Sequence, residues 1–139
     1  MGDGHHGWAA AEIVLAVRDA FVYEREKHDS IGHEVVFFSG IPEHWFREGI
    51  TFRIRNAPIP GARISMEATT SNEATIIDIL FDPIDSNHSG VWTLHFPFHS
   101  DDILSDKETC KSFSLGNGET LVKVEPRSQR LVVRHQTGP

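Results

Sequence analysis

The sequence predicts an α+β fold: one N-terminal amphipathic helix packed on a mainly antiparallel β-sandwich or partial barrel of about seven to eight short strands. Two observations lead to this prediction. A stretch near the N-terminus, residues 8–28, lacks glycine and proline and repeats its apolar residues with a helical period. From residue 33 onward the period changes to two, and turn-forming residues separate the segments at short intervals.

The helix is expected over residues 8–28, where residues that favour helix are frequent. One apolar stripe follows the i, i+3, i+4, i+7 spacing: Ala10, Ile13, Val14, Val17, Ala20 and Phe21. Cations in the last turn and Gly32 just beyond it predict that the helix ends near residue 29. The stripe is wide enough to dock the helix on the sheet, so we expect the helix to cover one face.

Eight segments alternate apolar and polar residues, as half-buried strands do. They begin at residues 33, 50, 62, 74, 91, 110, 120 and 130. The links between them are too short for parallel crossovers, so we expect antiparallel neighbours. Asn117-Gly118 favours a two-residue type I′ hairpin in which Leu115 faces Thr120 and Phe113 faces Val122.

Length and composition indicate one domain with one core, because the 139 residues are 39% hydrophobic and 24% charged. Residues 33–135 form its β-rich part, and the ends, residues 1–7 and 136–139, are expected to be flexible. A net charge of −7 disfavours nucleic acid as a partner. The apolar stretch 8–17 is too short to cross a bilayer and follows no basic segment, which indicates neither a membrane span nor a signal peptide. Cys110 is the only cysteine, which excludes an intrachain disulfide and favours a reducing, cytoplasmic location.

The segment VWTLHFPFHSDD, residues 91–102, combines two histidines and two aspartates with aromatic residues. On a strand its aromatic side chains face the core, whereas His95 and His99 face solvent, and Pro97 indicates an edge strand. The Cα atoms of these histidines would lie about 13 Å apart, too far to share one ion without a bend. His95 and His99 are therefore weak metal candidates.

A second weak metal candidate precedes this strand, where Asp85, Asn87 and Ser89 have the spacing that opens a calcium-binding loop. The match fails at its twelfth position, because Phe96 stands where a bidentate glutamate is required. We therefore expect an ordinary turn here, and no structural metal in the chain.

Four charged residues are candidates for ligand binding. Asp78 lies among apolar residues, where a carboxylate can acquire a perturbed pKa. If Ser71-Asn72 is the centre of a hairpin, Arg63 lies one diagonal step from Asp78, and we expect an ion pair between them. Arg53 and Arg55 share the solvent face of one strand and could hold a carboxylate or a phosphate.

The chain has no nucleophile elbow, phosphate-binding loop, dinucleotide fingerprint or zinc-protease motif. This favours a non-enzymatic binding or assembly module without a cofactor. We expect it to act through a protein partner or through self-association as a homo-oligomer. Leu15 and Val22, together with Trp8, lie off the main helix stripe and are the expected partner surface. The alternative is a small enzyme or ligand-binding protein with a pocket between helix and curved sheet, carrying Asp78, Arg53 or a histidine.

Overall fold

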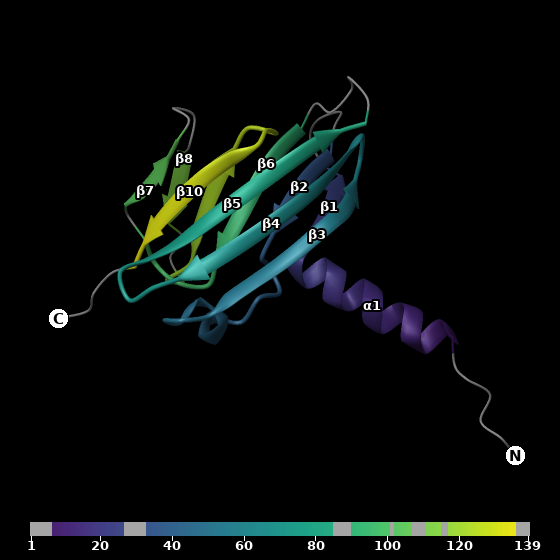
Figure 1. The fold of residues 1–139 in the computed structure, drawn as a ribbon, viewed down its shortest axis with the longest axis horizontal. Coiled ribbons are helices and arrows are strands. Elements are labelled where there is room, and N and C mark those ends of the chain that lie inside the picture. Colours follow the sequence, from purple (N-terminus) through teal and green to yellow (C-terminus); the bar gives the residue numbers. More distant parts are fainter. Residues whose placement is uncertain are drawn as a thin grey trace, which may run out of the picture.

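The computed structural model describes residues 7–26, 33–84, 90–100, 102–106, 111–114 and 117–135. Within them, one α-helix precedes ten strands that form two five-stranded sheets. Figure 1 shows the sheets stacked on each other, with the helix projecting from the stack. The predicted α+β class is confirmed. Of the two expected architectures, the described strands form the sandwich and not the partial barrel, because neither sheet closes on itself.

The ten strands divide between the sheets as follows. In spatial order, the first sheet contains β1 (Val22–Glu26), β2 (His33–Phe37), β6 (Gly90–Phe96), β9 (Thr120–Val124) and β8 (Lys111–Ser114). The second contains β3 (Thr51–Ile59), β4 (Ala62–Thr70), β5 (Ala74–Pro83), β10 (Gln129–Arg134) and β7 (Ile103–Ser105). A short 3-10 helix, η1 (Glu43–Phe46), precedes β3.

One strand pair, β2 and β6, is parallel, which agrees with a mainly antiparallel fold because no short link joins these two strands. All the other described pairs are antiparallel. Between β2 and β6 the chain leaves the first sheet and builds β3, β4 and β5 of the second. A connection of that length allows the chain to re-enter the first sheet either parallel or antiparallel to β2.

The two sheets enclose one core made of alternate residues from their strands. One region of this core is aromatic: Phe38, Phe46, Phe52 and Phe96 contact one another with ring centroids 5.2 to 6.1 Å apart, mostly edge to face. Such contacts add to the stabilisation from burial. They hold the segment that carries η1 firmly against the sandwich.

The helix is shorter than predicted. α1 (Gly7–Phe21) ends at Phe21 instead of near residue 29, because the next five residues form β1. Val22 pairs with Phe37 and is fully buried in the core. Val22 and Tyr23 are a β-branched and an aromatic residue, and both pair with β2. The stabilisation from this pairing and from burial outweighs the helix propensity of the charged residues that follow. Gly7 already belongs to α1, and residues 1–6 and 136–139 lie outside the described residues.

The β4–β5 hairpin has a different register from the one predicted. Glu67 faces Asp78 and Met66 faces Ile79, a shift of two residues from a turn centred on Ser71-Asn72. Ser71 Oγ accepts hydrogen bonds from the backbone N–H groups of Glu73 and Ala74, which stabilises a longer turn. Because the shift is even, the apolar side chains still face the core.

The β8–β9 register also differs from the prediction, because Phe113 pairs with Leu121 and Ser114 with Thr120. Gly118 has a positive φ of 86°, but Asn117 does not, so the type I′ turn is not formed. Instead, Asn117 Oδ1 accepts a hydrogen bond from the backbone N–H of Glu119. The connection is therefore longer than two residues, and Leu115 lies outside the described residues.

Candidate functional site

The last turn of α1 is attached to the segment that follows β2. The backbone carbonyl of Phe21 accepts a hydrogen bond from Phe38 N at 2.9 Å, and that of Ala20 accepts one from Gly40 N at 3.2 Å. Gly40 permits this approach, since a Cβ atom there would lie 2.7 Å from Ala20 Cα. The carbonyls at the helix end are thus satisfied by the sandwich itself.

Arg18 fixes the same turn from another side. Its guanidinium donates to both carboxylate oxygens of Glu24, at 2.6 and 3.1 Å, and to the carbonyl of Pro58 at 2.8 Å. The hydrogen bond to Glu24 is the main reason why the pKa of Arg18 is raised. These contacts join α1 to β1 and β3, so the direction of the helix relative to the sandwich is fixed.

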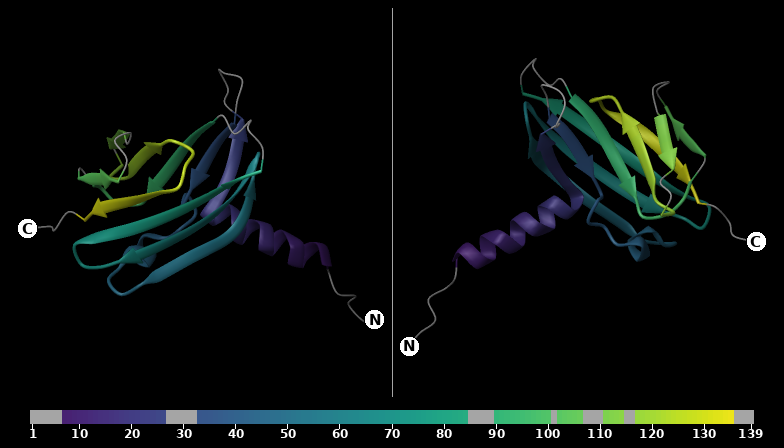
Figure 2. Two further views of the ribbon diagram at one scale, coloured as in Figure 1. Left: turned by 45° about the horizontal axis from the view of Figure 1, so that its top comes forward. Right: turned by 180° about the vertical axis from the view of Figure 1, so that it is seen from behind.

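Beyond this turn the helix leaves the sandwich, as Figures 1 and 2 show. No residue of α1 is buried, and Ile13, Val14 and Val17 of the predicted docking stripe are 66%, 67% and 58% exposed. The contact with the sheets is therefore narrower than expected. On the opposite side of α1, Trp8 and Leu15 are 72% and 53% exposed.

A groove runs between the apolar stripe and the segment that follows β2, with a volume of about 400 Å³. Its lining consists of Ile13, Ala16, Val17, Ala20 and Phe21 from α1 and Gly40, Ile41, Pro42 and Trp45 from the sandwich. Within this lining, the rings of Phe21 and Trp45 meet edge to face at 6.0 Å. The lining contains no charged side chain. The prediction that Val22 belongs to an exposed partner surface is wrong, because Val22 is fully buried in the core.

The outer face of the second sheet carries a row of charges across four strands. Arg53, Glu67, Asp78 and Arg130 are successive cross-strand partners on β3, β4, β5 and β10. The predicted Asp78–Arg63 pair is wrong: Arg130 binds both carboxylate oxygens of Asp78, at 2.6 and 3.0 Å, and Arg63 faces Asp82 on β5. Asp78 is about half exposed, so it has the surroundings of a surface ion pair and not of a catalytic carboxylate.

The expected anion site at Arg53 and Arg55 lies in the same area. Arg53 Nε is 3.3 Å from Glu67 Oε2, and a bulge with a positive φ at Asn56 interrupts the strand just after Arg55. A shallow depression of about 320 Å³ contains both arginines together with Glu67 and Asp78. The two carboxylates offset the positive charge, which disfavours an anion there.

The histidine-rich segment is not on an edge strand as predicted, because β6 lies between β2 and β9. Trp92, Leu94 and Phe96 face the core, as expected, but Thr93 on the other face is buried as well. His95 Nε2 lies 3.0 Å from Glu119 Oε2. A hydrogen bond from Asn117, followed by this contact, lowers the pKa of Glu119.

No group of three or more histidine, cysteine or acidic side chains is placed to hold a metal ion within the described ranges. Asp85, Asn87, Ser89 and Cys110 lie outside those ranges.

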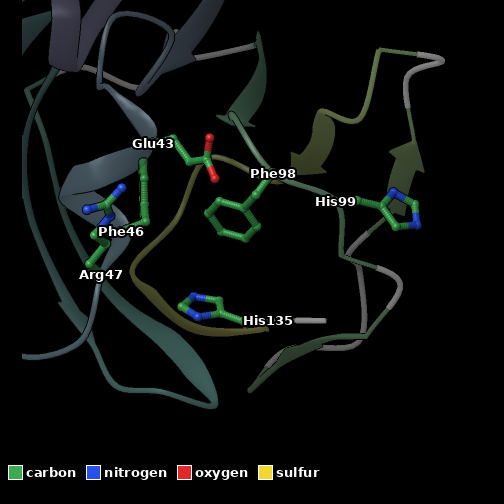
Figure 3. Close-up of a pocket in the computed structure, with 6 residues that line it drawn as sticks. All are labelled: Glu43, Phe46, Arg47, Phe98, His99 and His135. Atoms are coloured by element: carbon green, nitrogen blue, oxygen red, sulfur yellow. The ribbon is translucent and has the colours of Figure 1, made fainter. Parts of the chain in front are cut away.

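A second cavity, of about 310 Å³, lies where three distant segments meet (Figure 3). It is lined by Glu43, Phe46, Arg47, Phe98, His99 and His135. The rings of Phe46 and Phe98 meet at 5.3 Å, and those of Phe98 and His135 at 5.1 Å, both edge to face. The aromatic core thus extends to the surface here and forms the wall of the pocket.

His135 is held rigidly in this wall. Its Nε2 lies 2.8 Å from Thr75 Oγ1, which in turn lies 3.1 Å from Thr70 Oγ1, and both threonines are buried. Its backbone N–H donates to the carbonyl of Glu73. Burial lowers the pKa of His135, so its imidazole is neutral at neutral pH.

Sequence reasoning anticipated the groove only as an alternative, a pocket between helix and sheet, and it missed the pocket at Phe98. The two sites use Trp45, Phe46 and His135. The sequence predicts a link between strands at Trp45 and Phe46 and the end of a strand at His135. The available signal was the pair of large aromatic residues inside the link 40–49, since such residues are seldom left in a solvated turn.

Comparisons with known proteins gave no match: no protein-family model matches the chain, and no curated protein or solved structure matches it significantly. Within the part of the chain that the structure describes, no helix has the length and apolar character needed to cross a membrane.

Proposed function

We propose that this protein is a non-enzymatic assembly module that pairs with a second copy of itself through α1. The observation behind this is that α1 is fixed at its base, yet its apolar stripe is uncovered along the rest of its length. Apolar stripes on helices are normally covered, and exposed apolar patches commonly mark association sites.

Two copies complement each other because the stripe and the groove lie on the same face. In a two-fold symmetric pair, the N-terminal half of one α1 would lie antiparallel to the C-terminal half of the other and enter its groove. Ile13 and Val14 supply side chains that fill the groove. Ala16 and Ala20 are small enough to let the two helices approach closely.

The exposed area supports a weak, reversible dimer. Ile13, Val14 and Val17 are each exposed by more than half. Full burial of such a side chain contributes about 1.5–3 kcal/mol. About two thirds of this remains to be gained at each of the three positions in both copies, so covering them would contribute about 6–12 kcal/mol. The loss of translational and rotational freedom opposes association by about 4–15 kcal/mol. The dimer population is therefore expected to depend on protein concentration.

The alternative, an enzyme or ligand-binding protein, has less support from the same region. The groove is where this alternative predicts a pocket, but its lining offers no polar side chain except the Trp45 indole. Asp78, the predicted acidic group, lies on the outer face of the second sheet and pairs with Arg130. Cys110 is the only cysteine, and we assign the protein to a reducing, cytoplasmic compartment on that basis.

Sedimentation velocity over a concentration series tests the proposal with two matched variants. Val17→Glu places a charge in the groove, whereas Leu15→Glu places the same charge on the opposite side of α1. Both positions are exposed, so neither variant should unfold the monomer. We expect a wild-type dimer, at least about tenfold weaker association for Val17→Glu, and wild-type association for Leu15→Glu, with unchanged circular dichroism.

Two results would contradict the proposal. A wild type that stays monomeric up to about 1 mM would show that the stripe does not mediate self-association. A dimer that Leu15→Glu dissociates as strongly as Val17→Glu would show that the contact does not use the groove.

A further inference from the structure

The pocket at Phe98 differs chemically from the α1 groove, because it combines aromatic walls with a carboxylate. In Figure 3 the Glu43 carboxylate is directed toward the Phe98 ring. In the same view the Arg47 guanidinium lies beyond Phe46, and the His99 ring points away from Phe98. Of the charged side chains labelled in this view, only Glu43 is directed toward the Phe98 ring, so the charge that faces the ring is negative.

Glu43 has no hydrogen-bond or ion-pair partner among the residues that the structure describes, although Arg47 lies four positions further along the chain. A carboxylate beside an aromatic ring leaves a place for a positive charge. The edge-to-face contacts of Phe98 with Phe46 and His135 fix the orientation of its ring. The arrangement is thus built before any ligand arrives.

Arg47 is the one arginine in the lining, and in Figure 3 its guanidinium lies on the far side of Phe46 from the Phe98 ring, away from the space in front of Glu43. His135 is held by Thr75 and is neutral at neutral pH, so it does not repel a positive charge. Its other ring nitrogen can form a hydrogen bond with a hydroxyl or an ammonium group. The net charge of −7 also raises the concentration of cations near the protein.

We propose that this pocket binds a small alkylammonium ion, with the positive charge between the Glu43 carboxylate and the Phe98 ring. Aromatic faces attract ammonium ions through their quadrupole, and the neighbouring carboxylate adds a direct charge interaction. The volume of about 310 Å³ is at the small end of ligand pockets and suits a molecule of the size of choline. One partly exposed phenylalanine ring and one exposed carboxylate give modest affinity, with a Kd on the order of 1 mM.

Protein-observed NMR titration with choline tests the proposal, with its uncharged isostere 3,3-dimethylbutan-1-ol as the matched ligand and sodium chloride as the salt control. We expect saturable shifts around Glu43, Phe98 and His135 with choline. The isostere should bind at least about tenfold more weakly, because only the charge differs. A parallel titration with n-butylammonium distinguishes quaternary from primary ammonium ions.

Matched variants locate the site. Glu43→Gln should weaken choline binding by at least about tenfold, and Phe98→Leu should weaken it by a similar factor. Glu48→Gln removes a glutamate that does not line the pocket and should leave binding unchanged. The proposal is overturned if neither ammonium ion saturates, if the isostere or sodium chloride gives the same shifts, or if Glu43→Gln binds choline as the wild type does.

Discussion

Glu34 is a buried charge whose removal should destabilise the sandwich measurably. It lies on β2, on the face of the first sheet away from the core, and is only 8% exposed. Thr93 Oγ1 donates to its Oε1 at 2.5 Å, and Arg25 Nε donates to its Oε2 at 2.7 Å. These two bonds tie β1 and β6 to the strand between them. Glu34→Gln keeps the shape of the side chain but removes its charge.

The expected loss follows from the two hydrogen bonds. A hydrogen bond to a charged group contributes about 1.5–3 kcal/mol when buried, as the bond from Thr93 is. Arg25 is more than half exposed, so solvent screens its contribution to less than about 1 kcal/mol. Because glutamine can still accept from Thr93, we expect Glu34→Gln to lower the free energy of unfolding by about 1–2 kcal/mol at pH 7.

This loss should depend on pH in a defined direction. Desolvation raises the pKa of Glu34, but the hydrogen bonds from Arg25 and Thr93 outweigh it, and the pKa is lower than the ordinary value of 4.5. A carboxylate with a lowered pKa stabilises the folded state fully above its unfolded pKa and loses that contribution as pH falls through its folded pKa. The difference between wild type and Glu34→Gln should therefore be constant near neutral pH and shrink below 4.5.

Urea denaturation at several pH values measures this difference, and Glu26→Gln, at an exposed position of β1, is the matched control. The control should unfold like the wild type at every pH. If Glu34→Gln were as stable as the wild type at pH 7, or if its deficit grew on acidification, the network would not stabilise the fold as described.

Two further predictions concern packing and register. Gly40→Ala should lower the free energy of unfolding by about 1–3 kcal/mol, because its Cβ would collide with the backbone of the last turn of α1, whereas Gly7→Ala, in open space, should not destabilise the protein. In double-mutant cycles, alanine substitutions at Asp78 and Arg130 should be coupled at low salt and additive at about 1 M salt, where the Debye length is about 3 Å. The substitutions at Asp78 and Arg63 should be additive at any salt concentration, and coupling between them would contradict the observed register.

The strand pattern was predictable because alternation reports which side chains are buried and requires no knowledge of the partner strand. Ile64, Met66, Ile77 and Ile79 face the core as the period of two indicates, even though their hairpin register was wrong by two residues. Register depends on turn geometry, here on the Ser71 hydroxyl, and a short turn motif does not determine it. Strand register decides which charged side chains face each other, so the wrong register also led to the wrong partner for Asp78.

The start of the helix was predicted to within one residue, but its end and its neighbours were predicted wrongly. Val22 and Tyr23 continue a helix-favouring sequence, and only their pairing with Val36 and Phe37 on β2 shows that they belong to a strand. Amphipathicity predicts that a stripe is covered, but it does not say by what. The sequence therefore could not show that this sandwich leaves most of the stripe of α1 uncovered.

The two candidate sites share η1 as a common wall. In a 3-10 helix, residues three apart lie on the same side, so Pro42 and Trp45 line the groove while Glu43 and Phe46 line the pocket. A substitution that distorts the backbone of η1 would disturb both sites and could not separate assembly from cation binding. Val17 on α1 and Phe98 beyond β6 each line one site and lie outside this turn. If assembly and cation binding are independent, Val17→Glu will weaken the first and leave the second intact, and Phe98→Leu will do the reverse. If both properties fail together in either variant, coupling passes through η1, and by linkage the coupling must be equal in both directions.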